Sequence, residues 1–399
     1  MTRKSNNLRR NLNLLPWNAL FGSMQLFYPV AVLAYREVTG SFADAMGVFA
    51  VMSVSQALLE IPTGVFSDKI GRRMTFILGS IAEVLGIVLL ALSFHVSYGL
   101  ALLYAGAFCI GFANSMYSGN NDALLYETLL HYRRTKEAAK MIGRVYSMAQ
   151  IGLALSGVIA MALLYLGLGY KHLVALSVVP VFSAFLMTLF LVEPPTHKAK
   201  GVENLKHMKE ALKLIVRNPR LRGLAIAGAI KRGMGDAAHN FTPGFVDAVW
   251  PAWLTPLYRA GQNGLGAVSF WCAGRITKKF GLMKSLLGAT IYSYIASGIA
   301  YAMATFFSPI LMLTTQLSYA VGMTADGALK QENFSAAQRS TMGSLISFAG
   351  AIVGGIGSIL AGVLADYFGA AESLLIILLI TAPTAMVYFR LYKAERVAA

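Results

Sequence analysis

Residues 64–73 read GVFSDKIGRR, a short polar stretch that separates two long apolar runs. Each run is long enough to cross a lipid bilayer as a helix, which takes about 20 residues. The glycines at positions 64 and 71 allow a tight backbone turn and a close approach of helices. The carboxylate of Asp68 can accept hydrogen bonds from the N-terminus of another helix, where the helix dipole is positive. We therefore interpret this stretch as a loop between two membrane-spanning helices that also makes a specific contact.

The glycine pattern recurs twice further along the chain. Residues 274–281 read GRITKKFG, and their glycines come into register with those of the first copy after a shift of 210 residues. A third copy consists of Gly362, Asp366 and Gly369. Repeats at this spacing predict two six-helix halves, with three-helix units within each half.

The composition excludes a soluble enzyme. Of the 399 residues, 56% are hydrophobic and 13% are charged, and the mean hydropathy is +0.60. Soluble proteins carry about 25% charged residues. The apolar runs predict an all-α membrane protein with twelve spans, and both termini in the cytoplasm. The expected spans are 14–35, 43–66, 74–95, 98–119, 142–166, 172–192, 222–246, 257–277, 283–306, 309–329, 340–364 and 371–391.

The charge distribution sets the expected orientation. The formal net charge is +16, which in a soluble chain would suggest nucleic-acid binding. Here most of the Lys and Arg residues fall in the segments placed inside, and only Arg36, Lys171 and Arg259 fall in those placed outside. The basic N-terminus precedes a full-length span without a cleavage pattern, so it is not expected to be a signal peptide. Cys109 and Cys272 lie in apolar runs and are interpreted as packing residues.

The longest polar stretch divides the chain into a first half (1–192), a linker (193–221) and a second half (222–399). Apolar residues recur within the linker at helical spacing, and basic residues occupy its other faces. This pattern predicts an amphipathic helix on the inner membrane surface, which either tethers the halves or regulates them. The apolar positions are Leu205, Met208, Leu212 and Ile215, and the basic ones are Lys206, Lys209, Lys213 and Arg217.

Residues 64–73 resemble the signature of the major facilitator superfamily of secondary transporters. That signature is Gly, three residues, Asp, Arg or Lys, one residue, Gly, Arg, and Arg or Lys, and it lies between the second and third of twelve spans. The resemblance covers essentially the whole chain and implies transport by alternating access. It also implies a gate contact between Asp68 and the start of the eleventh helix, near 339–341. The implied gating residues are Gly64, Asp68, Lys69, Gly71, Arg72, Arg73 and Arg339.

Two observations bear on that gate. The second copy has Lys278, Leu282 and Met283 at the positions of the acid and the two arginines, so only the first copy is expected to act as a full gate. Plain positive-inside topology is the alternative explanation for the basic residues of the first copy, but it requires neither Asp68 nor the glycines.

The seventh span carries four polar residues, namely Lys231, Arg232, Asp236 and His239. Its charges begin roughly 13 Å into the membrane, where side chains of this kind are costly and commonly functional. Arg232, Asp236 and His239 share one helical face. The functional interpretation is a cavity face that binds an anionic or zwitterionic group and relays a proton. The alternative is that Arg232 and Asp236 neutralise each other as a structural pair.

Further polar residues lie within or at the ends of other spans. Glu83 in the third span suits proton coupling, and Glu60 near Asp68 is a gate candidate. Gln25, Tyr28 and the tryptophans Trp250, Trp253 and Trp271 are candidates to shape the cavity, although Trp250 and Trp253 fit an outer aromatic belt better than a cavity wall. The polar end of the fourth span either binds substrate or packs helices, and Asp326 is the corresponding acid of the tenth span. That polar end consists of Asn114, Ser118, Asn120, Asn121, Asp122 and Glu127.

These observations predict a secondary transporter, most simply a proton-coupled exporter of a small amphipathic or anionic compound in the inner or plasma membrane. The alternatives are uptake or facilitated diffusion of a small organic anion, and a membrane sensor with the same fold. The sequence contains no phosphate-binding glycine loop, so ATP is not the expected energy source. We expect a proton or ion gradient to drive transport, and we expect no bound cofactor. The fifth span lacks the Gly-Pro signature of drug antiporters. The expected partners are a small-molecule substrate, protons and the lipid bilayer, and nucleic acid is not expected. The protein is expected to be a monomer and not an enzyme.

Overall fold

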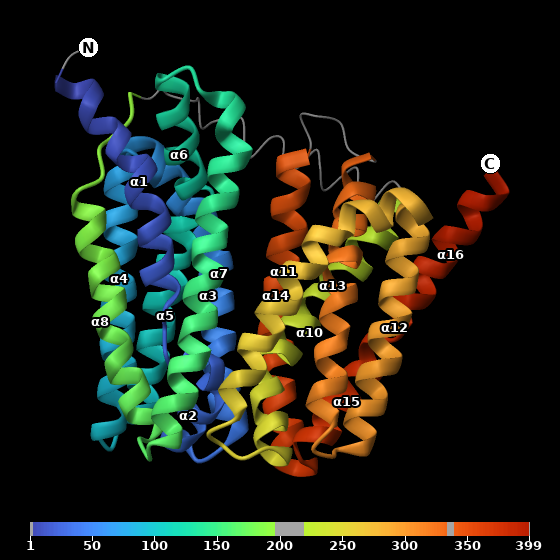
Figure 1. The fold of residues 1–399 in the computed structure, drawn as a ribbon. Helices are drawn as coiled ribbons and strands as arrows, with labels where there is room; N and C mark the ends of the chain where they lie inside the picture. Colours follow the sequence, from blue (N-terminus) through green and yellow to red (C-terminus); the bar gives the residue numbers. More distant parts are fainter. Residues whose placement is uncertain (1–2, 196–218, 333–338, 399) are drawn as a thin grey trace. The chain divides into compact units, whose positions relative to one another are not determined.

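The computed structural model describes residues 3–195, 219–332 and 339–398, and these residues contain helices and no strands. The chain divides into unit 1 (1–40 and 51–201) and unit 2 (41–50 and 202–399). Figure 1 shows the helices along the chain. Unit 1 contains α1 (Arg3–Ser23), η1 (Tyr28–Val30), α2 (Ala31–Thr39), most of α3 (Phe42–Ile70), α4 (Arg72–Leu92), η2 (Ser93–His95), α5 (Gly99–Tyr117), α6 (Asn120–His131), η3 (Thr135–Glu137), α7 (Ala138–Tyr165) and α8 (Tyr170–Leu189).

Unit 2 contains the second set of helices together with the first turns of α3. Its helices are α10 (Pro219–Val249), α11 (Thr255–Phe280), α12 (Leu282–Met303), α13 (Ser308–Glu332), α14 (Arg339–Phe368), α15 (Ala370–Thr381) and α16 (Pro383–Ala398). The amphipathic helix expected at 205–217 lies outside the described residues. The domain boundaries expected from the sequence therefore stay a prediction.

Eight helical stretches of the described chain are long and apolar enough to cross a membrane. They correspond to the expected second to sixth, ninth, eleventh and twelfth spans. The protein is thus a multi-pass membrane protein, whereas the count of twelve spans and the orientation of the termini stay predictions. α10 carries four ionisable residues in its middle, which lowers its hydropathy and explains why it is not among the eight.

The expected first and last spans are each interrupted. α1 ends at Ser23, and the chain resumes helical structure only at Tyr28. The backbone N–H of Leu26 in this break donates to the hydroxyl of Ser177, 2.8 Å away, which satisfies it without a helix. Near the C-terminus, Pro383 begins α16 because proline cannot donate to the preceding turn. The expected first span is therefore not one continuous helix, whereas the expected last span stays one candidate membrane span, Ala370–Arg390, divided into α15 and α16.

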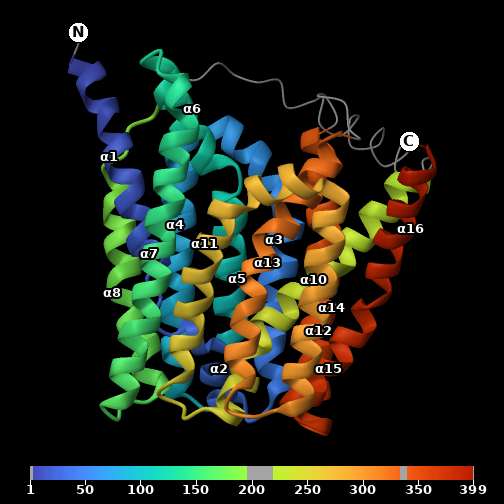
Figure 2. The ribbon, with the colours of Figure 1, turned by 45° about the vertical axis from the view of Figure 1, so that its right-hand side comes forward.

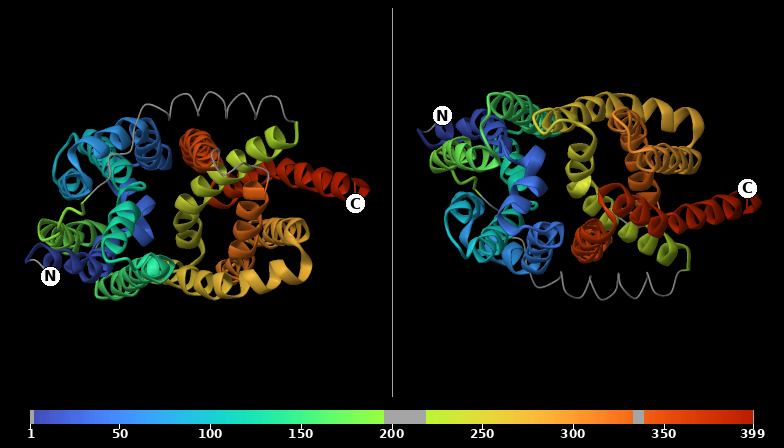
Figure 3. Two further views of the ribbon diagram at one scale, coloured as in Figure 1. Left: turned by 90° about the horizontal axis from the view of Figure 1, so that it is seen from above. Right: turned by 90° about the horizontal axis from the view of Figure 1, so that it is seen from below.

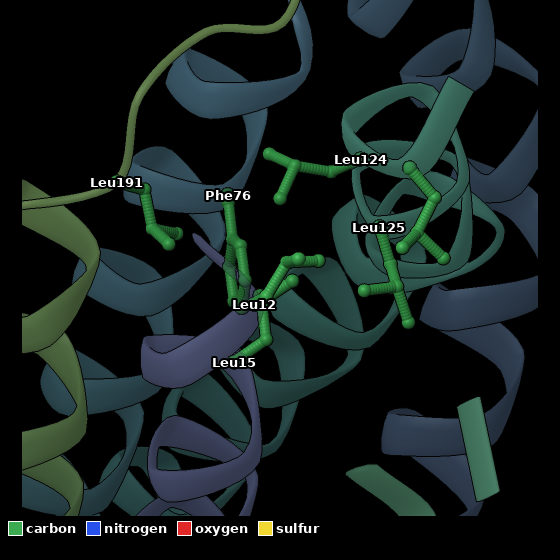
Figure 4. Packing of buried hydrophobic residues seen from close by; sticks show 7 residues of the cluster. Leu12, Leu15, Phe76, Leu124, Leu125 and Leu191 are labelled. Carbon is green, nitrogen blue, oxygen red and sulfur yellow. The ribbon is translucent and has the colours of Figure 1, made fainter. Parts of the chain in front are cut away.

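A hydrophobic cluster in unit 1 joins α1, α4 and α6 close to the start of α4. Figure 4 shows Phe76 of α4 beside Leu12 and Leu15 of α1, with Leu191 on its other side. Burial of such side chains stabilises a fold by about 1.5–3 kcal/mol each. The cluster therefore fixes the first turn of α4, which follows directly on the 64–73 stretch. Its buried members are Leu12, Leu15, Phe76, Leu124, Leu125, Leu129 and Leu191.

In unit 2, α10 packs closely against α14 (Figures 2 and 3). A Cβ at Gly233 would lie 2.6 Å from the backbone N of Gly354 and 2.8 Å from Cβ of Val353, so the two helices are in backbone contact there. Small residues allow this approach within membranes. The contact fixes which face of α10 is buried, and Arg232 and Asp236 lie beside that face and are exposed.

Candidate functional site

The three copies of the glycine pattern adopt the same backbone turn. Gly71, Gly281 and Gly369 have φ of 94°, 84° and 103°, and each immediately precedes a helix. In each copy the glycine N–H donates to a carbonyl four residues earlier, at 3.0, 2.9 and 3.0 Å. Only glycine adopts this combination of positive φ and extended ψ readily. The first glycine of the pattern is different, because Gly64 lies inside α3, and a Cβ there would meet no described atom within 4 Å.

Arg72 is the centre of the first copy. Its guanidinium lies 3.2 Å from the Asp68 carboxylate and 3.3 Å from that of Glu127 on α6, and it also donates to Ser67, 2.9 Å away. Ser67 donates to Asn120 at 2.9 Å, and the Asn120 amide donates to the Arg72 carbonyl. The structure therefore joins the stretch 64–73 to the polar start of α6 through charge-assisted hydrogen bonds.

Glu193, which the sequence analysis treated only as the start of the linker, caps α4. Its two carboxylate oxygens accept from the backbone N–H groups of Arg72 and Arg73, each at 2.7 Å. A carboxylate is favourable at this end of a helix because of the dipole and the unpaired amides. The only feature of the sequence that could have indicated this role is the position of Glu193 directly after the sixth expected span. The capping role itself depends on a contact across 121 residues.

The other expected gate residues make fewer contacts. Lys69 is exposed, and the Arg73 side chain donates to the Leu189 carbonyl at 2.9 Å. Glu60 accepts from Ser118 at 3.0 Å, where α5 ends and Gly119 turns the chain into α6. α14 begins at Arg339, whose side chain lies outside the description, so the expected contact of Asp68 with this helix stays a prediction.

The remaining residues of the fourth expected span separate into different surroundings. Asp122 is exposed and accepts from the Tyr146 hydroxyl at 3.3 Å. Asn114 is half-buried within α5, one turn from its end. Since Asn120 and Glu127 belong to the Arg72 network, these residues do not form one polar surface.

Glu83 lies in the middle of α4 and is bound by residues from two other segments of unit 1. The Tyr117 hydroxyl of α5 donates to one carboxylate oxygen at 2.8 Å, and the Gln25 amide donates to the other at 3.1 Å. Gln25 reaches it because the chain leaves the helical path between α1 and η1. Tyr117 and Gln25 are both neutral, and no ion pair of Glu83 occurs among the described residues.

On α10 of unit 2, the residues expected to form a site point in different directions. Lys231 is half-buried, donates to Thr290 of α12 at 2.7 Å, and lies 5.4 Å from the ring centroid of Tyr388. The side chain of Asp326 on α13 is within electrostatic reach of the same tyrosine. Lys231 and Asp326 therefore share one neighbourhood, between α10, α12, α13 and α16.

Arg232, Asp236 and His239 lie on the exposed side of α10, as the helical spacing predicts. Arg232 donates to Ser347 of α14 at 3.2 Å. Among the described residues, no ion pair within 4.0 Å joins Arg232 to Asp236, and the choice between a cavity face and a structural pair stays open.

His239 is paired with an arginine that the sequence analysis placed outside. Arg259 lies in α11 and is only 4% exposed, and its guanidinium contacts both the His239 ring and the His239 carbonyl. It also donates to Gln262, one turn further on, at 3.1 Å. The side chain of Arg259 is thus buried among its neighbours, and its expected position in an outside segment stays a prediction.

The tryptophans also differ from one another. Trp250 is 9% exposed and donates to the Phe306 carbonyl at 2.7 Å, so it packs inside unit 2 rather than in an aromatic belt. Trp253 and Trp271 are exposed, and Arg275 lies 4.8 Å from the Trp271 ring centroid.

Comparison with known proteins identifies a family and a fold. The model of the family described as Major Facilitator Superfamily matches residues 18–354. No curated protein sequence matches the chain. A structure of the nucleoside transporter NupG superposes with a TM-score of 0.79 at 13% identity, covering 97% of this chain and 99% of that chain.

Two further structures give similar superpositions. One is a bacterial homologue of the human lysosomal transporter Spinster, with a TM-score of 0.72, 16% identity, and coverage of 98% of this chain and 97% of the other. The other is a POT family transporter in complex with 5-aminolevulinic acid, with a TM-score of 0.70, 13% identity, and coverage of 96% and 95%. At these identities the likeness establishes the fold alone.

Proposed function

Because the chain belongs to the Major Facilitator Superfamily, we propose that it is a secondary transporter that couples proton movement to efflux of a small amphipathic or anionic compound. The family and the transporters among its structural neighbours indicate a transporter rather than an enzyme. Export, antiport with protons, a monomeric state and an inner or plasma membrane location are parts of the proposal.

Glu83 is the observation that carries the proposal of proton coupling. An ionised carboxylate within a membrane-spanning helix is costly, and such residues commonly take part in proton relays. Tyr117 and Gln25 hold both of its oxygens in place without adding a positive charge. Protonation needs only that one of these two hydrogen bonds rearranges. The group is therefore suited to bind and release a proton during a transport cycle.

The charges of unit 2 support a preference for anionic compounds. Lys231, Arg232 and Arg259 bring three cationic side chains to α10 and α11. The exposed face of α10 presents Arg232 with Asp236 near it, an arrangement that can bind an anionic or zwitterionic group.

Proton coupling is tested in proteoliposomes that contain an internal pH dye. Organic anions, zwitterions and lipophilic cations are added one at a time to vesicles with an imposed pH gradient. We expect anion-dependent proton flux in the parent protein and at least about a tenfold loss in Glu83→Gln, which keeps the shape and one accepting oxygen but cannot ionise. Glu137→Gln is the matched control, because it removes an acid from an exposed ion pair in the same unit.

The substrate site is tested with the same panel. Arg232→Ala and Asp236→Asn should weaken anion-dependent flux, whereas Arg275→Ala, which removes an exposed arginine over Trp271, should not. Flux driven only by lipophilic cations would contradict the anionic preference. Anion movement that is unchanged by Glu83→Gln and carries no protons would contradict proton coupling and would support facilitated diffusion.

A further inference from the structure

The third copy of the glycine pattern holds the beginning of α3. The two carboxylate oxygens of Asp366 accept from the backbone N–H groups of Phe42 and Ala43, both at 2.8 Å. These amides belong to the first turn of α3, where N–H groups have no partner within the helix. The positive end of the helix dipole strengthens the binding of a carboxylate there. Asp366 at the end of α14 therefore caps a helix that begins 324 residues earlier.

Packing around this cap brings the two backbones together. A Cβ at Gly362 would lie 2.7 Å from Cα of Ala43 and also too close to the backbone of Phe42. The Phe42 ring meets the edge of Phe241 on α10, with centroids 5.1 Å apart. Glycine at 362 is thus required for the approach that puts Asp366 within reach of both amides.

α3 also carries a cap of its own, which is separate from Asp366. The Ser41 hydroxyl accepts from the N–H of Asp44 at 3.1 Å and donates to the Asp44 carboxylate at 3.0 Å. This local cap satisfies a different amide. The first turn of α3 can therefore stay helical when the Asp366 contact is broken.

The place of this contact in the fold suggests its role. Residues 41–50 group with unit 2, whereas the rest of α3 groups with unit 1. A change in the packing of residues 41–50 against the rest of unit 2 has to bend α3 or release its first turn. Bending a continuous helix breaks internal hydrogen bonds, whereas release breaks two bonds to one side chain and the ring contact of Phe42 with Phe241, and leaves the helix intact. Release is therefore the easier change.

We propose that Asp366 and Gly362 form a releasable latch that binds the first turn of α3 to α14. The distribution of basic residues places this end of α3 outside. The latch is thus the counterpart, at the opposite end of α3, of the contact expected from Asp68.

The latch is tested by cysteine accessibility, which needs neither a substrate nor a proton gradient. Ala45 is fully buried within the part of α3 that groups with unit 2, so Ala45→Cys reports on this segment. The reporter is placed in the full chain with Cys109→Ser and Cys272→Ser, and modification by N-ethylmaleimide is timed in detergent. We expect Asp366→Asn to speed modification about tenfold, as loss of a charge-assisted contact predicts.

Two controls separate release of the latch from general loosening. Asp44→Asn neutralises an acid of the same helix turn that has no described bond to α14, and it should leave the rate within about twofold. A second reporter, Ala296→Cys, lies buried in α12 and should stay equally slow in every variant. Gly362→Ala attacks the same contact by steric conflict, without a change of charge, and should also speed modification at Ala45→Cys.

An unchanged rate in both Asp366→Asn and Gly362→Ala would overturn the latch. Equal acceleration by Asp44→Asn would also overturn it, because any loss of charge at the helix end would then suffice. Since no transport is measured, these outcomes leave the proposed proton-coupled efflux untouched, and a failure of proton coupling leaves the latch untouched.

Discussion

Asp68 in the first copy of the glycine pattern pairs with Arg72, four residues further along its own loop, at 3.2 Å. Asp366 in the third copy binds two backbone amides of α3 instead. The backbone turn that follows each acid is the same. The difference lies four residues after the acid, where the first copy has Arg72 and the third has Ala370. In this structure the acid with a local cation pairs with it, whereas the acid without one binds a distant helix.

The largest effect is expected at the turn glycines. Gly281→Ala should lower the free energy of unfolding by about 2 kcal/mol, because alanine is strained at this φ and ψ. Gly71→Ala should cost about 1 kcal/mol more, since its Cβ would lie 2.7 Å from the Glu193 carboxylate and would displace that cap. Unfolding in mixed detergent micelles measures both. Equal losses would show that the Glu193 contact adds nothing to the first copy.

Asp68→Asn should reduce transport about tenfold while the unfolding free energy changes by less than about 1 kcal/mol, because a half-exposed ion pair contributes little to stability. The transport loss is expected if Asp68 also binds the start of α14 during the cycle. Uptake or efflux rates in proteoliposomes measure it, and membrane insertion should be normal. Glu137→Gln breaks a comparable exposed pair with Arg134 and serves as the control. Parent-like transport in Asp68→Asn would refute the gate assignment.

Replacing the α4 cap should have a moderate effect. Glu193→Gln keeps an accepting oxygen but removes the charge from the helix end, so we expect a loss of about 1 kcal/mol in the unfolding free energy. Glu372→Gln is the counterpart in the third copy, where the acid lies in the first turn of α15 itself. It should cost only about 0.3 kcal/mol, because its charge acts within one helix. A larger loss in Glu372→Gln would reverse the comparison.

The smallest effect tests the comparison most directly. Ala370→Arg gives the third copy the cation that the first copy has, four residues after its acid. The new arginine should compete with α3 for Asp366 and speed modification of Ala45→Cys about threefold, as expected for an i, i+4 ion pair. Ala370→Gln, which adds similar bulk without charge, is the control. If both substitutions act equally, the local cation does not decide how the acid is used.

Much of the fold could be predicted from the sequence. The helical membrane architecture, the family and the three equivalent turns at Gly71, Gly281 and Gly369 follow from patterns along the chain. Such patterns reflect local physics, namely the length of an apolar helix and the backbone freedom of glycine. The interruption after Ser23 was missed because it depends on a hydroxyl from α8.

The candidate site was predicted only in part. Glu83 and the exposed face of α10 were identified because charged residues stand out in apolar runs. The partners Tyr117, Gln25 and Arg259 were not assigned to these groups. Nothing in their local sequence marks them, since a tyrosine or glutamine in or beside an apolar helix is common.

The sequence by itself thus determined which segments are helical and apolar, where the chain turns and which residues carry charge. Only the tertiary structure decided which residues those charges meet: Glu193 at the start of α4, Asp366 at the start of α3, and Arg259 beside His239. The physical reason is range. Hydropathy and turn preference act over a few neighbouring residues, whereas a hydrogen bond between distant segments exists only once the helices have packed.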